Sequence, residues 1–419
     1  MDGGALQAPP GRRGPQSRRF TWGVFAKKSS GSKGVLTGHN SGQKTRPRRA
    51  VAPADAREHG VGQKPEEIAS IQVLRAIAAS AVFAGHLTTE LYDTAHWDPL
   101  PHLTVLAGGV DLFFVISGFI MVHASRDMFG RATMRREFVR RRLIRIVPLY
   151  WMIIGVLAVH AMVRYGTAGL TAANLSPGLI ISSFFFVPWA RPDGDMTPLL
   201  AIGWTLSYEM LFYLLFALSL ALRRGAAVGA TALMLIAAIA AAVPGAGPPG
   251  PTAGWPALIA VEFIYGMAIA LIAGAVQLPR AGALSILGIG IAGLVVVAQA
   301  SPQSDYRFAF WGIPCAFVVA GATLHRFALA SWPWRPPIVL GNASYALYLV
   351  HPFMAMPRLA AAKIFGATPA PWLEHPIAYG IALVALMIGV ALAVHYFVER
   401  PVIRILRRWS RRDPVPALV

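Results

Sequence analysis

Charged residues are scarce in this chain of 419 residues. Asp, Glu, Lys and Arg together make up 14% of it, whereas hydrophobic residues make up 55%. A soluble domain of this size cannot hide so many apolar residues in its core, and the mean hydropathy of +0.53 agrees with that argument. The shortage of charge therefore argues against a soluble protein and indicates an all-α, polytopic membrane protein.

Cysteine is nearly absent as well. The one cysteine, Cys315, lies within an apolar run. A single thiol excludes a disulfide within the chain and a metal site built from cysteines. We expect Cys315 to be a small buried hydrophobic residue.

Acidic residues number 19 against 38 basic ones, and the excess positive charge is unevenly placed. Residues 1–64 carry thirteen Lys or Arg and only three acids, among many Gly, Pro and Ser. We expect this segment to be a disordered basic arm in the cytoplasm that can lie against anionic membrane lipid. A nucleic-acid-binding protein would place its basic residues on a folded face, so no nucleic-acid partner is expected.

Ten apolar segments are long enough to cross a bilayer as helices. They cover residues 70–91, 103–124, 146–164, 203–222, 227–243, 257–276, 281–299, 308–326, 338–356 and 376–398. One more apolar piece, 178–189, has the shorter length that is typical of a re-entrant or interfacial segment.

The basic residues between these segments indicate the orientation of the chain. With ten spans and a cytoplasmic N-terminus, the Arg-rich stretches 126–145, 223–224 and 326–335 all fall on the inner side, as the positive-inside rule requires. We predict a transmembrane domain over 65–405 and a basic cytoplasmic tail over 406–419, so that both termini lie in the cytoplasm.

Ionisable side chains inside a span are costly and mark candidate functional sites. Arg75 and His86 in the first span are eleven residues apart, which places them on nearly the same helix face and about 16 Å apart along the axis. Both can therefore face one interior channel. A snorkelling arginine and a hydrogen-bonded core histidine are the alternative interpretation.

The second span places Asp111 at a depth similar to that of His86, because the two spans are antiparallel neighbours. A carboxylate that accepts the imidazole N–H would orient the ring for general-base catalysis. A purely structural pair is the alternative. Small residues should let this helix approach its neighbours closely; they are Gly108, Gly109, Ser117 and Gly118.

Three more titratable residues fall in the outer half of their spans. They are Glu209, Glu262 and His351. Any one of them can be a partner for a neighbouring helix, but several at one depth predict a polar cavity that opens outward.

A run of arginines marks the cytoplasmic end of the third span: Arg140, Arg141, Arg142 and Arg145. Arg142 and Arg145 are three residues apart and so share one helix face. Their guanidinium groups suit bidentate contacts with phosphate. The alternative is that the run only fixes topology or anchors the helix to lipid.

Taken together, these residues resemble the acyltransferase type-3 family of bacterial membrane proteins, close to its exopolysaccharide-modifying branch. The resemblance covers residues 68–405 and depends on motifs that are specific in combination. The motifs are Arg75 and His86; Asp111, Ser117, Gly118 and Phe119 in GVDLFFVISGF; Arg142 and Arg145; Trp204, Tyr208 and Glu209 in WTLSYEMLFY; Ser344, Tyr345 and His351 in SYALYLVHP; and Glu399 and Arg400 in ERP.

The resemblance implies an enzyme of the bacterial inner membrane that transfers an acyl group, commonly acetyl from cytoplasmic acetyl-CoA, to hydroxyls of cell-surface glycans, lipids or secreted metabolites. It implies that His86 is catalytic and that Arg142 and Arg145 bind the donor. The full set of candidates comprises the catalytic residues His86, Asp111 and Glu209; the donor-binding residues Arg75, Arg142 and Arg145; and the cavity or acceptor residues Ser117, Trp204, Tyr208, Glu262, Tyr345 and His351.

Several alternatives stay open from the sequence. Direct transfer with His86 as general base and a covalent acyl-enzyme both fit, and the acyl group can be acetyl, succinyl or longer. The expected partners are acyl-CoA, a glycan or lipid-linked oligosaccharide, and membrane lipid; no metal or tightly bound cofactor is implied, and the oligomeric state is open. A transporter or flippase is the rival class, since buried Arg, His and carboxylates also form proton relays.

Overall fold

The structure is a computed structural model, and all the residues it describes belong to one unit, Gly60–Val419. It describes residues 65–95, 103–172, 175–191, 196–242, 255, 257–300, 306–327, 329, 335–357 and 375–410. The predicted N-terminal arm, 1–64, and the last part of the predicted tail, 411–419, lie outside the described residues.

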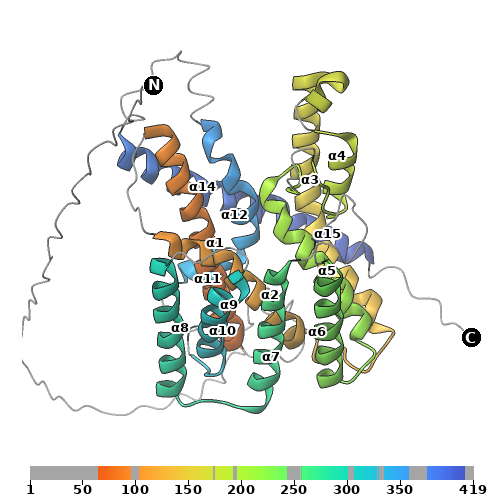
Figure 1. Ribbon diagram of the computed structural model, residues 1–419, viewed down its shortest axis with the longest axis vertical. Helices are drawn as coiled ribbons and strands as arrows, with labels where there is room; N and C mark the ends of the chain where they lie inside the picture. The colour runs from red at the N-terminus through yellow and green to blue at the C-terminus, as the bar shows by residue number, and fades with distance from the viewer. Residues whose placement is uncertain are drawn as a thin grey trace, which may run out of the picture. The chain divides into compact units, whose positions relative to one another are not determined.

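The described residues form helices joined by turns, and no strand occurs among them. The first half of the chain contains α1 (Pro65–Ala95), η2 (Leu103–Gly108), α2 (Gly109–Ala124), α3 (Met134–Ala172), α4 (Pro177–Phe184), η3 (Ala201–Gly203), α5 (Trp204–Ser219) and α6 (Arg224–Ala241). The second half contains η4 (Leu258–Val261), α7 (Glu262–Ala275), α8 (Arg280–Ala300), α9 (Arg307–Phe310), α10 (Gly312–Thr323), α11 (Pro336–Asn342), α12 (Ser344–Val350), η7 (His351–Ala355), α14 (Pro376–Val394), the π-helical turn η9 (His395–Glu399) and α15 (Arg400–Ser410) (Figure 1).

Each of the ten predicted spans contains a helix. Seven described helices are long and apolar enough to cross a membrane, or eight if the bent pair α11 and α12–η7 counts as one span. Two further apolar helices, Gly109–Ala124 and Arg307–Thr323, are shorter. Helix α4 has only eight residues, about 12 Å, and cannot cross a bilayer core of about 30 Å. The chain is therefore a helical membrane protein, as the sequence predicts.

The ninth predicted span is broken in the middle. Its two halves, Pro336–Asn342 and Ser344–Ala355, meet at an angle of 63°. The break places Ser344 at the start of α12 and His351 at its end, so that one short helix carries polar groups at both ends.

Helix α2 is packed tightly between two neighbours, and small residues allow this. A Cβ atom at Gly118 would collide with the backbone carbonyl of Phe263 in α7, and one at Gly266 would collide with the carbonyl of Val115 in α2. On the other side, a Cβ at Gly109 would lie 2.8 Å from the carbonyl oxygen of Ala78 in α1. The predicted close approach of this helix is confirmed.

Helix α1 is the element that connects the two ends of the candidate site. It packs against α2, α10, α11, α12, η7 and α14 (Figure 1). Because it carries both Arg75 and His86, its neighbours decide what each of these side chains can contact.

Candidate functional site

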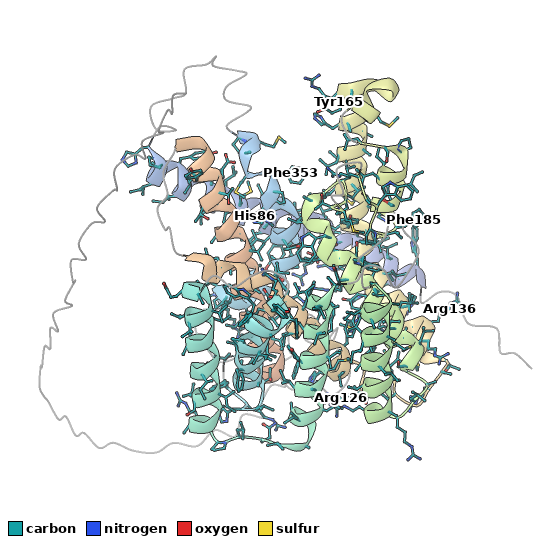
Figure 2. All side chains as sticks on the ribbon, in the orientation of Figure 1. His86, Arg126, Arg136, Tyr165, Phe185 and Phe353 are labelled. Carbon is teal, nitrogen blue, oxygen red and sulfur yellow. The ribbon has the colours of Figure 1, made fainter. Side chains whose placement is uncertain are left out.

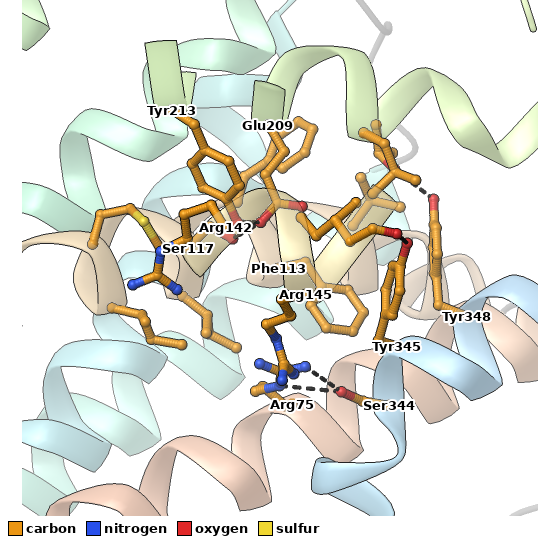
Figure 3. A pocket seen from close by; sticks show the side chains of 18 residues that line it. Arg75, Phe113, Ser117, Arg142, Arg145, Glu209, Tyr213, Ser344, Tyr345 and Tyr348 are labelled. Carbon is orange, nitrogen blue, oxygen red and sulfur yellow. Dashed lines mark hydrogen bonds between the residues drawn. The ribbon is translucent and has the colours of Figure 1, made fainter. Parts of the chain in front are cut away.

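A cavity of about 90 Å³ lies among α1, α2, α3, α5 and α12 (Figure 3). Apolar side chains such as Phe113, Phe114 and Ile146 form part of its wall. The polar residues in the wall are Arg75, Ser117, Arg142, Arg145, Thr205, Glu209, Tyr213, Ser344, Tyr345 and Tyr348. Five elements far apart in the sequence thus contribute to one polar space inside the bundle.

Arg75 is fixed in the cavity by the broken span. Its Nε and Nη2 atoms donate hydrogen bonds to Oγ of Ser344, at 3.1 and 2.8 Å (Figure 3). The contact is possible because α11 approaches α1 so closely that a Cβ at Gly341 would collide with the carbonyl of Gln72. The guanidinium group is therefore held facing the cavity.

Glu209 receives two hydroxyl groups on one carboxylate oxygen. Ser117 of α2 donates to Oε1 at 3.0 Å, and Tyr213, one helical turn further along α5, donates to the same oxygen. These bonds orient the carboxylate toward the cavity that all three residues line. Glu209 is the single carboxylate among the residues that line it.

The arginine run at the start of α3 divides into two pairs with different contacts. Arg140 and Arg141 both bind the carboxylate of Glu137, three and four residues earlier on the same helix. Arg142 and Arg145 line the cavity instead. Arg141 and Arg145 are four residues apart and differ by only about 40° around the axis, so their contacts and not the helical period distinguish the two pairs.

The cavity wall carries more positive than negative charge. Arg142 lies over the rings of Phe138 and Tyr213, with its Cζ atom 5.5 and 6.0 Å from their centroids. Together with Arg75 and Arg145 it contributes three guanidinium groups, which stay protonated in proteins, against the carboxylate of Glu209. Such an excess of positive charge favours an anionic ligand.

His86 lies outside the cavity wall, where it pairs with His351. The two rings meet edge to face, with centroids 4.9 Å apart and planes at 88°. His351 is fully buried, whereas His86 is exposed. Figure 2 shows His86 on α1 beside the segment that carries Phe353, two residues after His351. Tyr348 connects the two places, because it lines the cavity and its ring lies 5.8 Å from that of His351.

The predicted hydrogen bond between Asp111 and His86 is not formed. Asp111 is completely buried and accepts a hydrogen bond from Nη2 of Arg307. The reason is the direction of the side chain around α2. Asp111 precedes the cavity residue Ser117 by six residues, about 120° around a helix axis, and so it faces α7 and α10 instead.

Glu262 of α7 completes this second polar group, which we call the carboxyl cluster: Asp111, Glu262 and Arg307. Glu262 is also completely buried, and it interacts directly with Asp111. Neither oxygen of Glu262, nor Oδ1 of Asp111, has a hydrogen-bond donor among the described residues. One proton held between the two carboxyl groups would join Oδ1 of Asp111 to one oxygen of Glu262 and leave one negative charge opposite Arg307.

The remaining predicted residues take structural positions around the cavity. Trp204 and Tyr208 pack edge to face with centroids 5.8 Å apart, and both contact the ring of Phe114. The hydroxyl of Tyr208 accepts a hydrogen bond from the backbone N–H of Ala257 at 3.2 Å. Tyr345 lines the cavity and donates its hydroxyl to the carbonyl of Ile146 at 2.7 Å.

The structure thus distributes the residues of the predicted polar cavity over three sites. They are the cavity lined by Arg75, Arg142 and Arg145, which we call the arginine cavity; the histidine pair, His86 and His351; and the carboxyl cluster. Sequence reasoning missed the roles of Tyr213, Tyr348 and Arg307. Tyr213 had a usable signal, since it lies four residues after Glu209 on the same helix. Arg307 had none, because 196 residues separate it from Asp111.

No group of three or more His, Cys, Asp or Glu side chains that could hold a metal ion occurs in the part of the chain that the structure describes. The candidate ligand site is the arginine cavity, because its three guanidinium groups suit an anion.

Comparison with known proteins shows the family of the chain. Residues 68–396 match the family described as "Acyltransferase domain". The exopolysaccharide production protein ExoZ of Rhizobium meliloti (strain 1021) is 31% identical over 312 residues, which cover 72% of this chain and 91% of ExoZ. The acyltransferase MdmB of Streptomyces mycarofaciens is 28% identical over 381 residues, which cover 83% of this chain and 93% of MdmB.

No solved structure matches the chain. The family match covers most of the chain and includes the arginine cavity, the histidine pair and the carboxyl cluster. The protein belongs to the membrane-bound acyltransferase type-3 family.

Proposed function

We propose that this acyltransferase moves an acetyl group from acetyl-CoA, bound from the cytoplasmic side, to a hydroxyl of a cell-surface or secreted glycan, with His86 as general base. The observation that carries the proposal is the position of His86 and Arg75 on one helix. The arginine faces the cavity, and the histidine contacts His351, whose ring packs on a tyrosine that lines the same cavity.

The arginine cavity supports a phosphate-bearing donor. Arg142 and Arg145 are spared from the ion pairs that occupy Arg140 and Arg141. Guanidinium groups bind phosphate oxygens through paired hydrogen bonds. The cavity of about 90 Å³ is far too small for a whole CoA molecule, so we infer that it holds only part of the donor, with the nucleotide end extending beyond α3 and the thioester end directed toward the histidine pair.

His86 is placed to act as a base. Its Nδ1 atom lies 3.3 Å from the carbonyl oxygen of Val82, so Nδ1 carries the hydrogen and Nε2 keeps its lone pair. In direct transfer, Nε2 takes the proton of the acceptor hydroxyl while the oxygen attacks the thioester carbonyl. The carbon–sulfur bond then breaks, and CoA leaves as a thiolate that must be protonated.

Asp111 does not support the imidazole in this mechanism, because its carboxylate is bound to Arg307. Glu209 is also bound, by Ser117 and Tyr213, on the donor side. We therefore assign Glu209 to donor positioning and favour His86 as the base that contacts the acceptor.

The glycan acceptor is inferred from ExoZ, whose name states a part in exopolysaccharide production. The ten helical segments and the basic loops between them support ten spans in a bacterial inner membrane, with both termini in the cytoplasm. Because Cys315 is completely buried, cysteines introduced into single loops can be labelled from either side to test that orientation.

The function is tested by His86→Ala and His86→Gln in cells that lack the native gene. We expect each to reduce acetylation of surface polysaccharide by at least about a hundredfold, the usual range for loss of a general base, while the protein still inserts. His325→Gln is the matched control, since His325 contacts the carbonyl of Leu278 and the ring of Phe327 and does not line the cavity. Mass spectrometry of the polysaccharide measures the outcome, and normal acetylation in the His86 variants would refute the role.

The donor is tested with purified protein in lipid nanodiscs. We expect saturable binding of CoA and slow hydrolysis of acetyl-CoA, whereas a transporter or flippase should do neither. The same two measurements with succinyl-CoA decide the length and charge of the acyl group. Absence of both CoA binding and hydrolysis would exclude the proposed donor.

A further inference from the structure

His86 and His351 are held in the same way. Each ring places Nδ1 at 3.3 Å from the carbonyl oxygen of the residue four positions earlier, Val82 for His86 and Leu347 for His351. A carbonyl oxygen only accepts, so each Nδ1 carries the hydrogen and each Nε2 keeps a lone pair. In its neutral form, the pair therefore presents two Nε2 lone pairs.

Packing alone does not explain why a histidine is buried at position 351. His351 is 0% exposed, and its Nε2 atom has no hydrogen-bond partner among the described residues. An unsatisfied buried acceptor costs about 1–3 kcal/mol. The rings around it belong to Phe83, Tyr348 and His86, of which the histidine alone can exchange a proton with it through a ring nitrogen.

Two imidazoles with ring centroids 4.9 Å apart can share one proton easily but not two. A second positive charge at that distance is repelled, most strongly where one ring is excluded from water. The pair is thus able to take up a single proton and to move it between an exposed ring and a buried one.

The buried ring is on the side where a proton is needed. His351 lies between His86 and Tyr348, and Tyr348 lines the arginine cavity. The next step rests on the proposed function, in which direct transfer removes a proton from the acceptor hydroxyl and leaves a thiolate on the cavity side. The acceptor hydroxyl gives up one proton and the CoA thiolate takes up one proton, so a relay between these two groups balances the reaction.

We propose that His86 and His351 act as a two-histidine relay that carries the proton of the acceptor hydroxyl to the CoA thiolate. His86 accepts the proton, and Nε2 of His351 receives it from His86. His351 then releases it toward the cavity as CoA leaves, and both rings return to the neutral form.

The test compares His351→Gln, His86→Gln and the double variant in nanodiscs, with acetyl-CoA as donor and de-O-acetylated surface polysaccharide as acceptor. We expect kcat to fall at least about thirtyfold in His351→Gln with KM for acetyl-CoA unchanged, and the double variant to be no slower than His86→Gln, as for residues that act as a unit. Phe83→Leu is the control, because it changes the packing of the His351 ring and leaves both bases in place.

Proton transfer is separated from packing by two further measurements. Imidazole added to His351→Ala should restore at least about a tenth of the lost rate, and a proton inventory in mixtures of water and deuterium oxide should show two moving protons in the wild type and one in His351→Gln. Wild-type kcat in His351→Gln, or no rescue together with an unchanged inventory, would overturn the relay. If His86→Gln is inactive while His351→Gln is normal, the relay falls and the proposed function stands; if the wild type does not use acetyl-CoA, the proposed function falls.

Discussion

The arginine cavity and the carboxyl cluster both place charges inside the helix bundle, but only one of them has empty space beside its charges. Arg75, Arg142 and Glu209 face a cavity of about 90 Å³. In the carboxyl cluster, a Cβ added at Gly312 would lie 2.9 Å from Oε1 of Glu262, so even a methyl group does not fit. Charge beside a cavity can bind a ligand, whereas charge without space contributes to the folded structure.

The hydrogen bonds of the arginine cavity and of the carboxyl cluster differ in a way that agrees with this distinction. In the cavity, Ser117, Tyr213 and Ser344 donate to or accept from charged groups and leave part of each group facing the open space. In the cluster, Asp111 is sealed against Arg307 from another helix. We therefore expect substitutions in the cluster to change stability and substitutions in the cavity to change donor binding.

The largest effect should come from removing the guanidinium group of the cluster. Arg307→Met leaves the fully buried Asp111 without its cation, and removing one partner of a buried charge in this way costs about 3–5 kcal/mol of unfolding free energy. Arg142→Met is the matched change in the cavity and should cost less than half as much. Thermal unfolding of the purified proteins in detergent measures both, and equal losses would contradict the distinction.

Packing beside the cluster should be the next most sensitive feature. Gly118→Ala inserts a methyl group against the backbone of α7, and we expect a loss of about 1–3 kcal/mol, the usual cost of overpacking. Gly229→Ala in α6 is the control, since nothing lies within 4 Å of an added Cβ there. That variant should be as stable as the wild type or slightly more stable, and the same unfolding measurement compares them.

In the cavity, the double variant Arg142→Gln/Arg145→Gln should raise the KM for acetyl-CoA at least about tenfold, or about 1.4 kcal/mol of binding free energy, with little change in unfolding temperature. Arg140→Gln/Arg141→Gln removes the same charge from the same helix but leaves the cavity wall intact. Steady-state kinetics of CoA release compares the two. An equal rise of KM in both would show that only the positive charge at this end of α3 matters.

The smallest effect should follow Ser344→Ala. This change removes the hydroxyl that accepts both hydrogen bonds from Arg75, so the guanidinium group loses its fixed orientation. The lost hydrogen bonding is worth about 0.5–1.5 kcal/mol of free energy. We expect the KM for acetyl-CoA to rise about two- to tenfold with an unchanged unfolding temperature. A fall in kcat alone would place Arg75 on the acceptor side instead.

The sequence predicts well those features that depend on a single helix. Apolar length located the ten helical segments, and the three-residue spacing of Arg142 and Arg145 placed both on the cavity face. These features follow from the 3.6 residues per turn of an α-helix, so the spacing of residues in the sequence is enough to predict them. The same argument did not bring Arg75 and His86 to one channel, since Arg75 lines the cavity and His86 lies outside its wall.

Features that depend on rotation of one helix against another were missed. Depth in the membrane matched Asp111 with His86, but depth does not fix the direction of a side chain around the axis. The partner of Asp111 is Arg307, which the sequence assigns to a loop. The bend of 63° in the ninth predicted span was missed as well, because nothing in its apolar composition reveals it. That bend places Ser344 and His351 at opposite ends of α12.

The contact of backbone with backbone between α2 and α7 restricts how the enzyme can open. Where Gly118 and Gly266 meet, neither helix has side chains that can rearrange to let the other slide, so the two must move as one rigid pair. Ser117, and with it the Glu209 bond, moves with that pair. Entry of a large donor thus requires displacement of α3, α5 or α12, the three walls of the cavity that lack such a seam among the described residues.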